Sequence, residues 1–137
     1  MVNINVKYLC GLKCSVTHEP SGETFFTDAP LDHKGEAKYI SPTDLVAAAL
    51  ATCAATIMGM RADESGIDIS GMEVNVSKDM VNLPHRMIKK MIVNIIFPYK
   101  LDDKSFEIMT KIVKFCPVYF SINPEIEVIT NYSCKER

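Results

Sequence analysis

Residues 41–60 have the sequence SPTDLVAAALATCAATIMGM, and this segment indicates the architecture of the whole chain. Ser41 can cap a helix, Pro42 suits the first helical position, and Asp44 can complete a capping box. From Leu45 to Met60 there is no charged residue. We interpret this window as too short and too rich in alanine and threonine for a transmembrane span. A helix that is apolar on every side then needs to be covered by protein on every side.

The segments before this helix alternate apolar and polar residues, which is typical of β-strands. Turn-forming residues separate them, so we expect an antiparallel sheet at the N-terminus, followed by a long polar loop from Asp28 to Ile40. The expected strands cover residues 2–8, 13–18 and 23–27.

The segments after the helix alternate again, and Gly66 is expected to end the helix itself. A change of phase at Ser70-Gly71 suggests a bulge in the first of these strands. A second helix is expected to begin near Asp102-Asp103 and to end before Pro117, with Cys116 facing the core. The expected strands cover residues 67–76, 91–97 and 126–132.

Composition limits the classes of protein that the chain can belong to. With 137 residues, 47% of them hydrophobic, we expect a single domain over residues 1–137. A net charge of -2 and no basic run longer than Lys89-Lys90 disfavour nucleic acid as a partner. The alternating first residues lack the pattern of a signal peptide, so we expect a cytoplasmic protein without a membrane partner.

Two of the five cysteines stand out, and both have an ordinary structural explanation as well as a chemical one. Cys53 lies inside the apolar helix, where free cysteine most often acts as a small buried hydrophobe. Cys116 stands before Pro117, where it could simply be a core residue at a helix end. In the cytoplasm all five thiols would be reduced, and their odd number argues against a structural disulfide framework.

Cys10, Cys14 and His18 recur at four-residue spacing and could imitate a set of metal ligands. Gly11 interrupts the strand between them, however, and a fourth ligand is not evident in the sequence. We therefore expect no metal site.

The segment Ser41–Cys53, together with the later Cys-Pro dipeptide at 116–117, closely resembles the OsmC/Ohr family of thiol-dependent hydroperoxide reductases. Residues 18–22, 27–32 and 34–36 resemble its OsmC-like branch, and the resemblance covers nearly the whole chain. It implies an α+β, OsmC-like fold in which two chains intertwine and two central helices are packed by antiparallel sheets. Such a homodimer would cover the apolar helix on the sides that one chain has difficulty covering.

The resemblance also assigns roles to the two cysteines. It implies that Cys53 is the peroxidatic thiol, which attacks an organic hydroperoxide and becomes a sulfenic acid. Cys116 would be the resolving thiol, which condenses with that sulfenic acid to a disulfide that a cellular dithiol later reduces. The chemistry needs no cofactor, and it requires the two thiols to come within disulfide reach.

The sequence departs from the family pattern at two auxiliary positions. Thr43 stands where the family has a glutamate, with Asp44 beside it, although a helix cap explains Asp44 fully. The sequence has no arginine before Arg61, so Lys34 or Lys38 would have to replace the family arginine. A thiol among alanines favours its neutral form, and lysine can offset this by its charge but lacks the planar fork of arginine.

Two functions follow from this combination of matches and departures. The first is a cytoplasmic, homodimeric peroxidase that reduces organic hydroperoxides in oxidative or osmotic stress defence through Cys53 and Cys116. The alternative is a catalytically weak OsmC-like protein that binds a small apolar ligand at the dimer interface.

Overall fold

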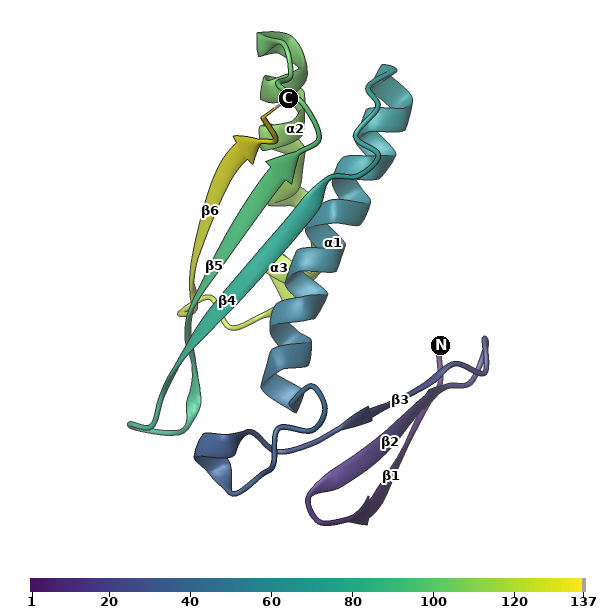
Figure 1. Cartoon of the computed structure of the whole chain (residues 1–137), viewed down its shortest axis with the longest axis vertical. Coiled ribbons are helices and arrows are strands. Elements are labelled where there is room, and N and C mark those ends of the chain that lie inside the picture. Colours follow the sequence, from purple (N-terminus) through teal and green to yellow (C-terminus); the bar gives the residue numbers. More distant parts are fainter. Residues whose placement is uncertain (137) are drawn as a thin grey trace. The chain divides into compact units, whose positions relative to one another are not determined.

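Two three-stranded sheets and a long helix make up the computed structural model of the chain, which describes residues 1–136 (Figure 1). The first sheet has the strand order β1-β2-β3 and the second has the order β4-β5-β6. This mixture of helices and sheets confirms the predicted α+β class. The strands are β1 (Ile4–Cys10), β2 (Lys13–His18), β3 (Thr24–Thr27), β4 (Glu73–Val81), β5 (Met87–Phe97) and β6 (Glu127–Cys134). The helices are α1 (Pro42–Ser65), α2 (Asp103–Ile112) and α3 (Pro117–Ser121), with short 3-10 turns η1 (Leu31–His33) and η2 (Val113–Phe115).

The described chain divides into two compact units. The first, Met1–Val46, holds the first sheet, the long loop and the start of α1. The second begins at Ala47 and holds the rest of α1 and the second sheet.

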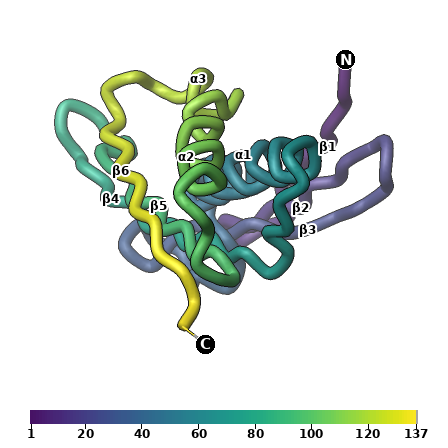
Figure 2. Tube along the Cα trace, turned by 90° about the horizontal axis from the view of Figure 1, so that it is seen from above, coloured from purple at the N-terminus to yellow at the C-terminus, as the bar shows by residue number. Residues whose placement is uncertain are grey.

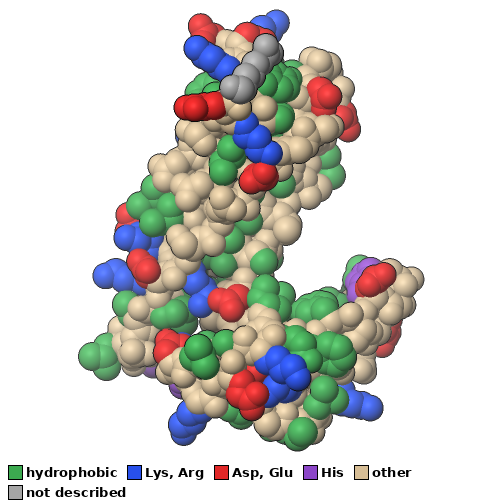
Figure 3. Space-filling view, viewed as in Figure 1, with side chains coloured by type: hydrophobic (Ala, Val, Ile, Leu, Met, Phe, Trp, Pro, Cys, Tyr) green, Lys and Arg blue, Asp and Glu red, His purple; other side chains and the backbone are tan. Residues whose placement is uncertain are grey.

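In the first unit the strands form the antiparallel sheet that the sequence predicts. The apolar residues of β1 are not half-buried as expected, because Ile4, Val6 and Tyr8 are 61%, 60% and 64% exposed. Hydrophobic side chains are accordingly visible at the surface of the molecule in Figure 3. This sheet therefore has an apolar face that its own unit leaves open.

Helix α1 begins at the predicted capping box. The Asp44 N–H donates to the Ser41 hydroxyl at 3.1 Å, and the Ser41 N–H donates to the Asp44 carboxylate at 3.0 Å. Gly66 follows the helix with a φ of 69°, a left-handed conformation that glycine adopts without strain. Both predicted ends of the helix are confirmed.

The helix has 24 residues and a mean hydropathy of 1.6 in its most apolar window, so by length and composition it could cross a membrane. This corrects the expectation that the segment is too short for a span. Its buried residues lie on one face, which packs inside the described chain. They are Ala47, Leu50, Ala51, Ala54, Met58 and Ala62. The opposite face exposes Thr52, Thr56 and Met60, so burial on all sides stays a prediction that concerns the dimer.

Strand β5 lies at the centre of the second sheet, and from Met91 to Phe97 every second residue of it is buried. The core residues on this face are Met91, Val93, Ile95 and Phe97. The Phe97 ring lies 6.3 Å from the ring of Phe106 on α2 and 6.4 Å from that of Tyr132 on β6. Figures 1 and 2 show α2 along the sheet at β5 and β6.

Strand β6 runs parallel to β5, whereas the resemblance implied antiparallel sheets only. The physical reason is the connection: the chain returns through α2, η2 and α3, and a parallel pair needs a long crossover of this kind. The second sheet is therefore mixed, with β4 antiparallel and β6 parallel to the central strand.

Two further boundaries differ from the predictions. Strand β4 begins at Glu73 and not at residue 67, because Ser70 and Gly71 form a turn with Gly71 at a φ of 86°. The register irregularity of β4 lies instead between Asp79 and Met80. Helix α2 begins after Asp102 as predicted but ends at Ile112.

Candidate functional site

The second unit brings the two predicted thiols together. Cys53 lies on α1 and is half-buried, whereas Cys116 is 1% exposed and links η2 to α3. Pro117 does not end a helix here but occupies the first position of α3, for which a ring-fixed φ and a missing N–H are well suited. The Cys116 side chain forms a hydrogen bond with Cys53, so sulfurs 63 positions apart in the printed sequence are neighbours.

The surroundings of Cys116 favour the protonated form of its thiol. Burial raises the pKa of the Cys116 thiol, and the hydrogen bond with Cys53 and the negative charge of a Cys53 thiolate raise it further. The backbone N–H groups of Tyr119 and Val118 partly oppose this effect. Cys116 therefore favours its protonated form.

A cavity of about 340 Å³ borders Cys116 within the second unit. Leu50 and Ala54 of α1 form one wall, and Val93 of β5 with Val128 and Thr130 of β6 form the side next to the sheet. The segment from η2 to α3 closes the remaining side with Val113, Lys114, Cys116 and Tyr119. The walls are mainly apolar.

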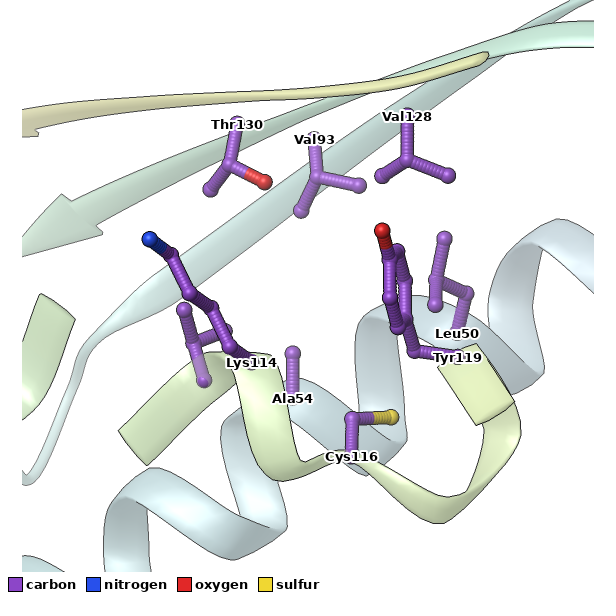
Figure 4. A pocket seen from close by; sticks show the side chains of 9 residues that line it. Leu50, Ala54, Val93, Lys114, Cys116, Tyr119, Val128 and Thr130 are labelled. Atoms are coloured by element: carbon purple, nitrogen blue, oxygen red, sulfur yellow. The ribbon is translucent and has the colours of Figure 1, made fainter. Parts of the chain in front are cut away.

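Figure 4 shows how the polar groups of this cavity are arranged. The side chains of Lys114 and Tyr119 both extend from the η2–α3 segment toward the sheet, on opposite sides of Cys116. The Thr130 hydroxyl lies on the sheet side, at the end of the cavity where Lys114 stands. One ammonium and two hydroxyl groups therefore border an otherwise apolar space.

The loop between β3 and α1 carries Lys34 and Lys38 in the first unit. Asp28, which is 1% exposed, holds this loop in place. Its Oδ2 accepts a hydrogen bond from the Lys38 backbone N–H at 3.0 Å and lies 3.5 Å from the Lys13 ammonium. Burial alone would raise the pKa of Asp28, but these groups outweigh it and lower the pKa. Position 35 requires glycine, because a Cβ there would lie only 1.7 Å from the Ala29 carbonyl oxygen.

Both loop lysines are exposed. Lys34 has a φ of 69° at the end of η1, and the Lys38 ammonium lies 5.6 Å from the centre of the Tyr39 ring. A role for either lysine beside Cys53 stays a prediction.

Thr43 and Asp44, the other auxiliary candidates, lie in the first turn of α1. The Thr43 hydroxyl is 3.4 Å from the Ser41 hydroxyl, and Asp44 forms the capping box. Both positions are therefore part of the helix start, and the capping role expected for Asp44 is confirmed.

The polar residues of the cavity, Lys114 and Tyr119, were not predicted from the sequence. Both lie close to Cys116 in the chain, so their proximity to it could have been expected. Their orientation could not, because the sequence does not show how the chain turns between residue 114 and residue 119. It is the break between η2 and α3 that turns both toward the sheet.

The family model described as OsmC-like protein matches residues 35–131 of the chain. No curated protein matches the sequence. Among solved structures, the chain is 37% identical to a Psychrobacter arcticus protein provisionally described as an osmotic stress induced and detoxification response protein. The match covers 96% of each chain with a TM-score of 0.91.

Two other solved structures have the same fold at lower identity. An organic hydroperoxide resistance protein OsmC from Legionella pneumophila is 16% identical, with 97% of this chain and 96% of that chain covered and a TM-score of 0.77. An organic hydroperoxide resistance protein from Elizabethkingia anophelis is also 16% identical, with coverages of 98% and 96% and a TM-score of 0.74.

Proposed function

The chain belongs to the OsmC-like protein family, and on that premise we propose that it is a thiol peroxidase that reduces organic hydroperoxides in stress defence. The observation that carries the proposal is the hydrogen bond between the Cys53 and Cys116 side chains. Cys53 is half-buried and Cys116 is buried beside it, so one thiol can meet a peroxide and the other is in place to resolve the sulfenic acid.

The reaction begins at Cys53. Its thiolate attacks the terminal oxygen of the hydroperoxide, an S–O bond forms, the O–O bond breaks, and the leaving alkoxide takes up a proton to become an alcohol. Cys53 is thereby oxidised to a sulfenic acid and the hydroperoxide is reduced. The Cys116 side chain lies next to Cys53, so the second thiol is already in place when the sulfenic acid forms.

Cys116 then completes the cycle. Once it loses its proton, its sulfur attacks the Cys53 sulfur, the S–S bond forms, and the hydroxyl group of the sulfenic acid leaves as water. The N–H groups of Val118 and Tyr119 support this step, because they favour a negative charge on the Cys116 sulfur. A cellular dithiol restores both thiols by disulfide exchange, which suits a cytoplasmic location.

The partner in this proposal is a second copy of the chain. The open apolar face of β1 supports an intertwined homodimer, because it would leave apolar surface in water in a single chain. Lys34 or Lys38, donated by either copy, would supply the cation that the absent arginine supplies elsewhere in the family.

The test is anaerobic stopped-flow oxidation of the reduced protein by cumene hydroperoxide and by hydrogen peroxide. We expect fast, saturable oxidation by the organic peroxide, loss of it in Cys53→Ser, and a trapped Cys53 sulfenic acid in Cys116→Ser. Cys134→Ser removes an exposed thiol at the end of β6 and serves as the matched control. Unchanged oxidation in Cys53→Ser, or a sulfenic acid on another cysteine, would remove the mechanism.

The lysines are tested by the single replacements Lys34→Met and Lys38→Met, with Lys7→Met on β1 as control. Loss of the responsible charge is expected to slow peroxide consumption at least tenfold, which is about 1.4 kcal/mol in the barrier. Equal rates in all three variants would exclude both lysines.

The alternative function is favoured by one observation, the absence of any arginine before Arg61 together with threonine at position 43. A protein without efficient peroxide chemistry would instead bind a small apolar ligand at the dimer interface. Oxidation of Cys53 no faster than that of a free thiol in the stopped-flow experiment would select this alternative.

A further inference from the structure

The Cys53–Cys116 pair is also a set of two sulfur ligands. The two side chains are hydrogen-bonded to each other, so their sulfurs are already neighbours in the reduced protein. Two metal–thiolate bonds of about 2.3 Å, placed in line, span about 4.6 Å. A small shift of the two side chains is therefore enough to admit a metal ion between the sulfurs.

No third ligand accompanies the pair in the part of the chain that the structure describes. No group of three or more His, Cys, Asp or Glu side chains there is placed to hold a metal ion. Figure 4 shows the polar ends of Lys114 and Tyr119 next to the sheet, whereas the Cys116 sulfur lies on the side of the helices. The pair therefore offers two ligands, and both are sulfur.

We propose that the reduced pair binds one soft monovalent cation, copper(I), in line between the two sulfurs. Thiolate ligands select copper(I), whereas zinc prefers four ligands and magnesium and calcium prefer oxygen. As the ion binds, each thiol releases its proton to solvent and two sulfur–copper bonds form, with no change of oxidation state. This site is separate from Cys10, Cys14 and His18, which lie in the first unit.

The surroundings of the two sulfurs suit the charge of this complex. Two thiolates and one monovalent ion carry one net negative charge, and Cys116 is 1% exposed, so the charge needs partners inside the protein. The backbone N–H groups of Val118 and Tyr119 interact with the Cys116 sulfur and favour its charged form. Cys53 is half-buried, so the ion reaches the pair from that side.

The proposal concerns binding by the reduced protein and goes beyond the proposed peroxidase function, which it does not need. If the protein is a peroxidase, the two functions share Cys53. Copper(I) would then occupy the sulfur that attacks the hydroperoxide and block its oxidation with one ion per chain.

The experiment is an anaerobic titration of the reduced protein with copper(I), in which the coloured chelator bicinchoninate competes for the ion and no peroxide is present. The other thiols also attract copper(I), so the starting protein carries Cys10→Ser, Cys14→Ser and Cys134→Ser and keeps only the pair. We expect it to take up one ion per chain. Adding Cys53→Ser or Cys116→Ser should weaken binding at least a hundredfold, and zinc(II) should bind the pair more weakly than copper(I).

X-ray absorption at the copper edge counts the ligands, and two sulfur neighbours are expected. If circular dichroism shows that the triple variant does not fold, wild type compared with Cys116→Ser and with Cys134→Ser gives the same answer. The proposal is overturned by equal copper(I) affinity with and without Cys116, or by no binding in a protein that keeps the pair. One ion per two chains, or three or more ligands on copper, would also overturn it.

Discussion

The strands β1 and β5 both alternate apolar and polar residues, yet their surroundings differ completely. In β5, Val93 is 2% exposed and Ile95 is fully buried, because helices cover that face of the second sheet. In β1, Ile4 and Val6 are 61% and 60% exposed. An alternating strand requires a cover for its apolar face, but the strand itself does not specify whether that cover comes from the same chain or from another.

The largest effect is expected in the covered sheet. Phe97→Ala removes a ring that contacts both Phe106 and Tyr132, so it leaves a cavity in the core and should cost about 3–5 kcal/mol of unfolding free energy. Urea denaturation measures the loss. Val6→Ala in β1 is the matched variant for the open sheet. A cost below about 1 kcal/mol for Phe97→Ala would contradict the description of the second sheet as the core.

The open sheet should show its effect in assembly. Val6→Asp places a charge on the apolar face of β1, so we expect the dissociation constant of a homodimer to rise at least a hundredfold, about 2.7 kcal/mol. Analytical ultracentrifugation measures the change. Asn5→Asp adds the same charge to the opposite face of the same strand and is the control. A wild-type protein that is monomeric at micromolar concentration would contradict the prediction, because no second chain would then cover the apolar face of β1.

Within the second unit, the Cys116 thiol should make stability depend on alkaline pH. Its pKa is raised in the folded protein by burial and by Cys53, so the unfolded chain loses this proton first. The stability contribution is complete below the ordinary thiol pKa of about 8.5 and is lost as the pH rises through the folded value, by up to about 1.4 kcal/mol per pH unit.

Denaturation curves from about pH 8 to about pH 10, the range in which thiols titrate, measure this loss of stability. The pKa of Tyr132 is also raised by burial, so the total pH dependence contains its contribution. The difference between wild type and Cys116→Ala isolates the thiol. If the free energy of unfolding depends on pH identically in both proteins, then the pKa of Cys116 is not raised by folding.

The smallest effect belongs to the start of α1. Asp44→Ala removes one half of the capping box and should cost about 1 kcal/mol in unfolding free energy. Asp44→Asn keeps an oxygen acceptor and should cost less. If both variants also slow peroxide consumption more than Thr43→Ala does, then Asp44 has a role beyond the cap.

The sequence predicted the elements of this fold well where a local signal marks them. Ser41, Pro42 and Asp44 mark the start of α1, and Gly66 marks its end, because caps act through neighbouring backbone groups. The direction of β6 had no such signal. It depends on where the helical connection returns the chain, which is a property of tertiary packing.

The candidate site was predicted in the same uneven way. The Cys-Pro dipeptide identified Cys116, and family resemblance paired it with Cys53, but neither revealed that Pro117 starts a helix. Lys114 and Tyr119 were missed because their shared direction depends on the break between η2 and α3. A single lysine or tyrosine in a sequence does not indicate that its side chain borders a cavity.

The parallel pairing of β6 with β5 has a consequence for the order of folding. The hairpin of β4 and β5 is local in sequence and can form early, whereas β6 can pair only after the whole helical connection has closed. Cys116 lies in that connection, so the event that completes the sheet also buries this thiol. During refolding, protection of the Cys116 thiol from alkylation should therefore rise together with protection of the β6 amides, and later than that of the β4–β5 hairpin.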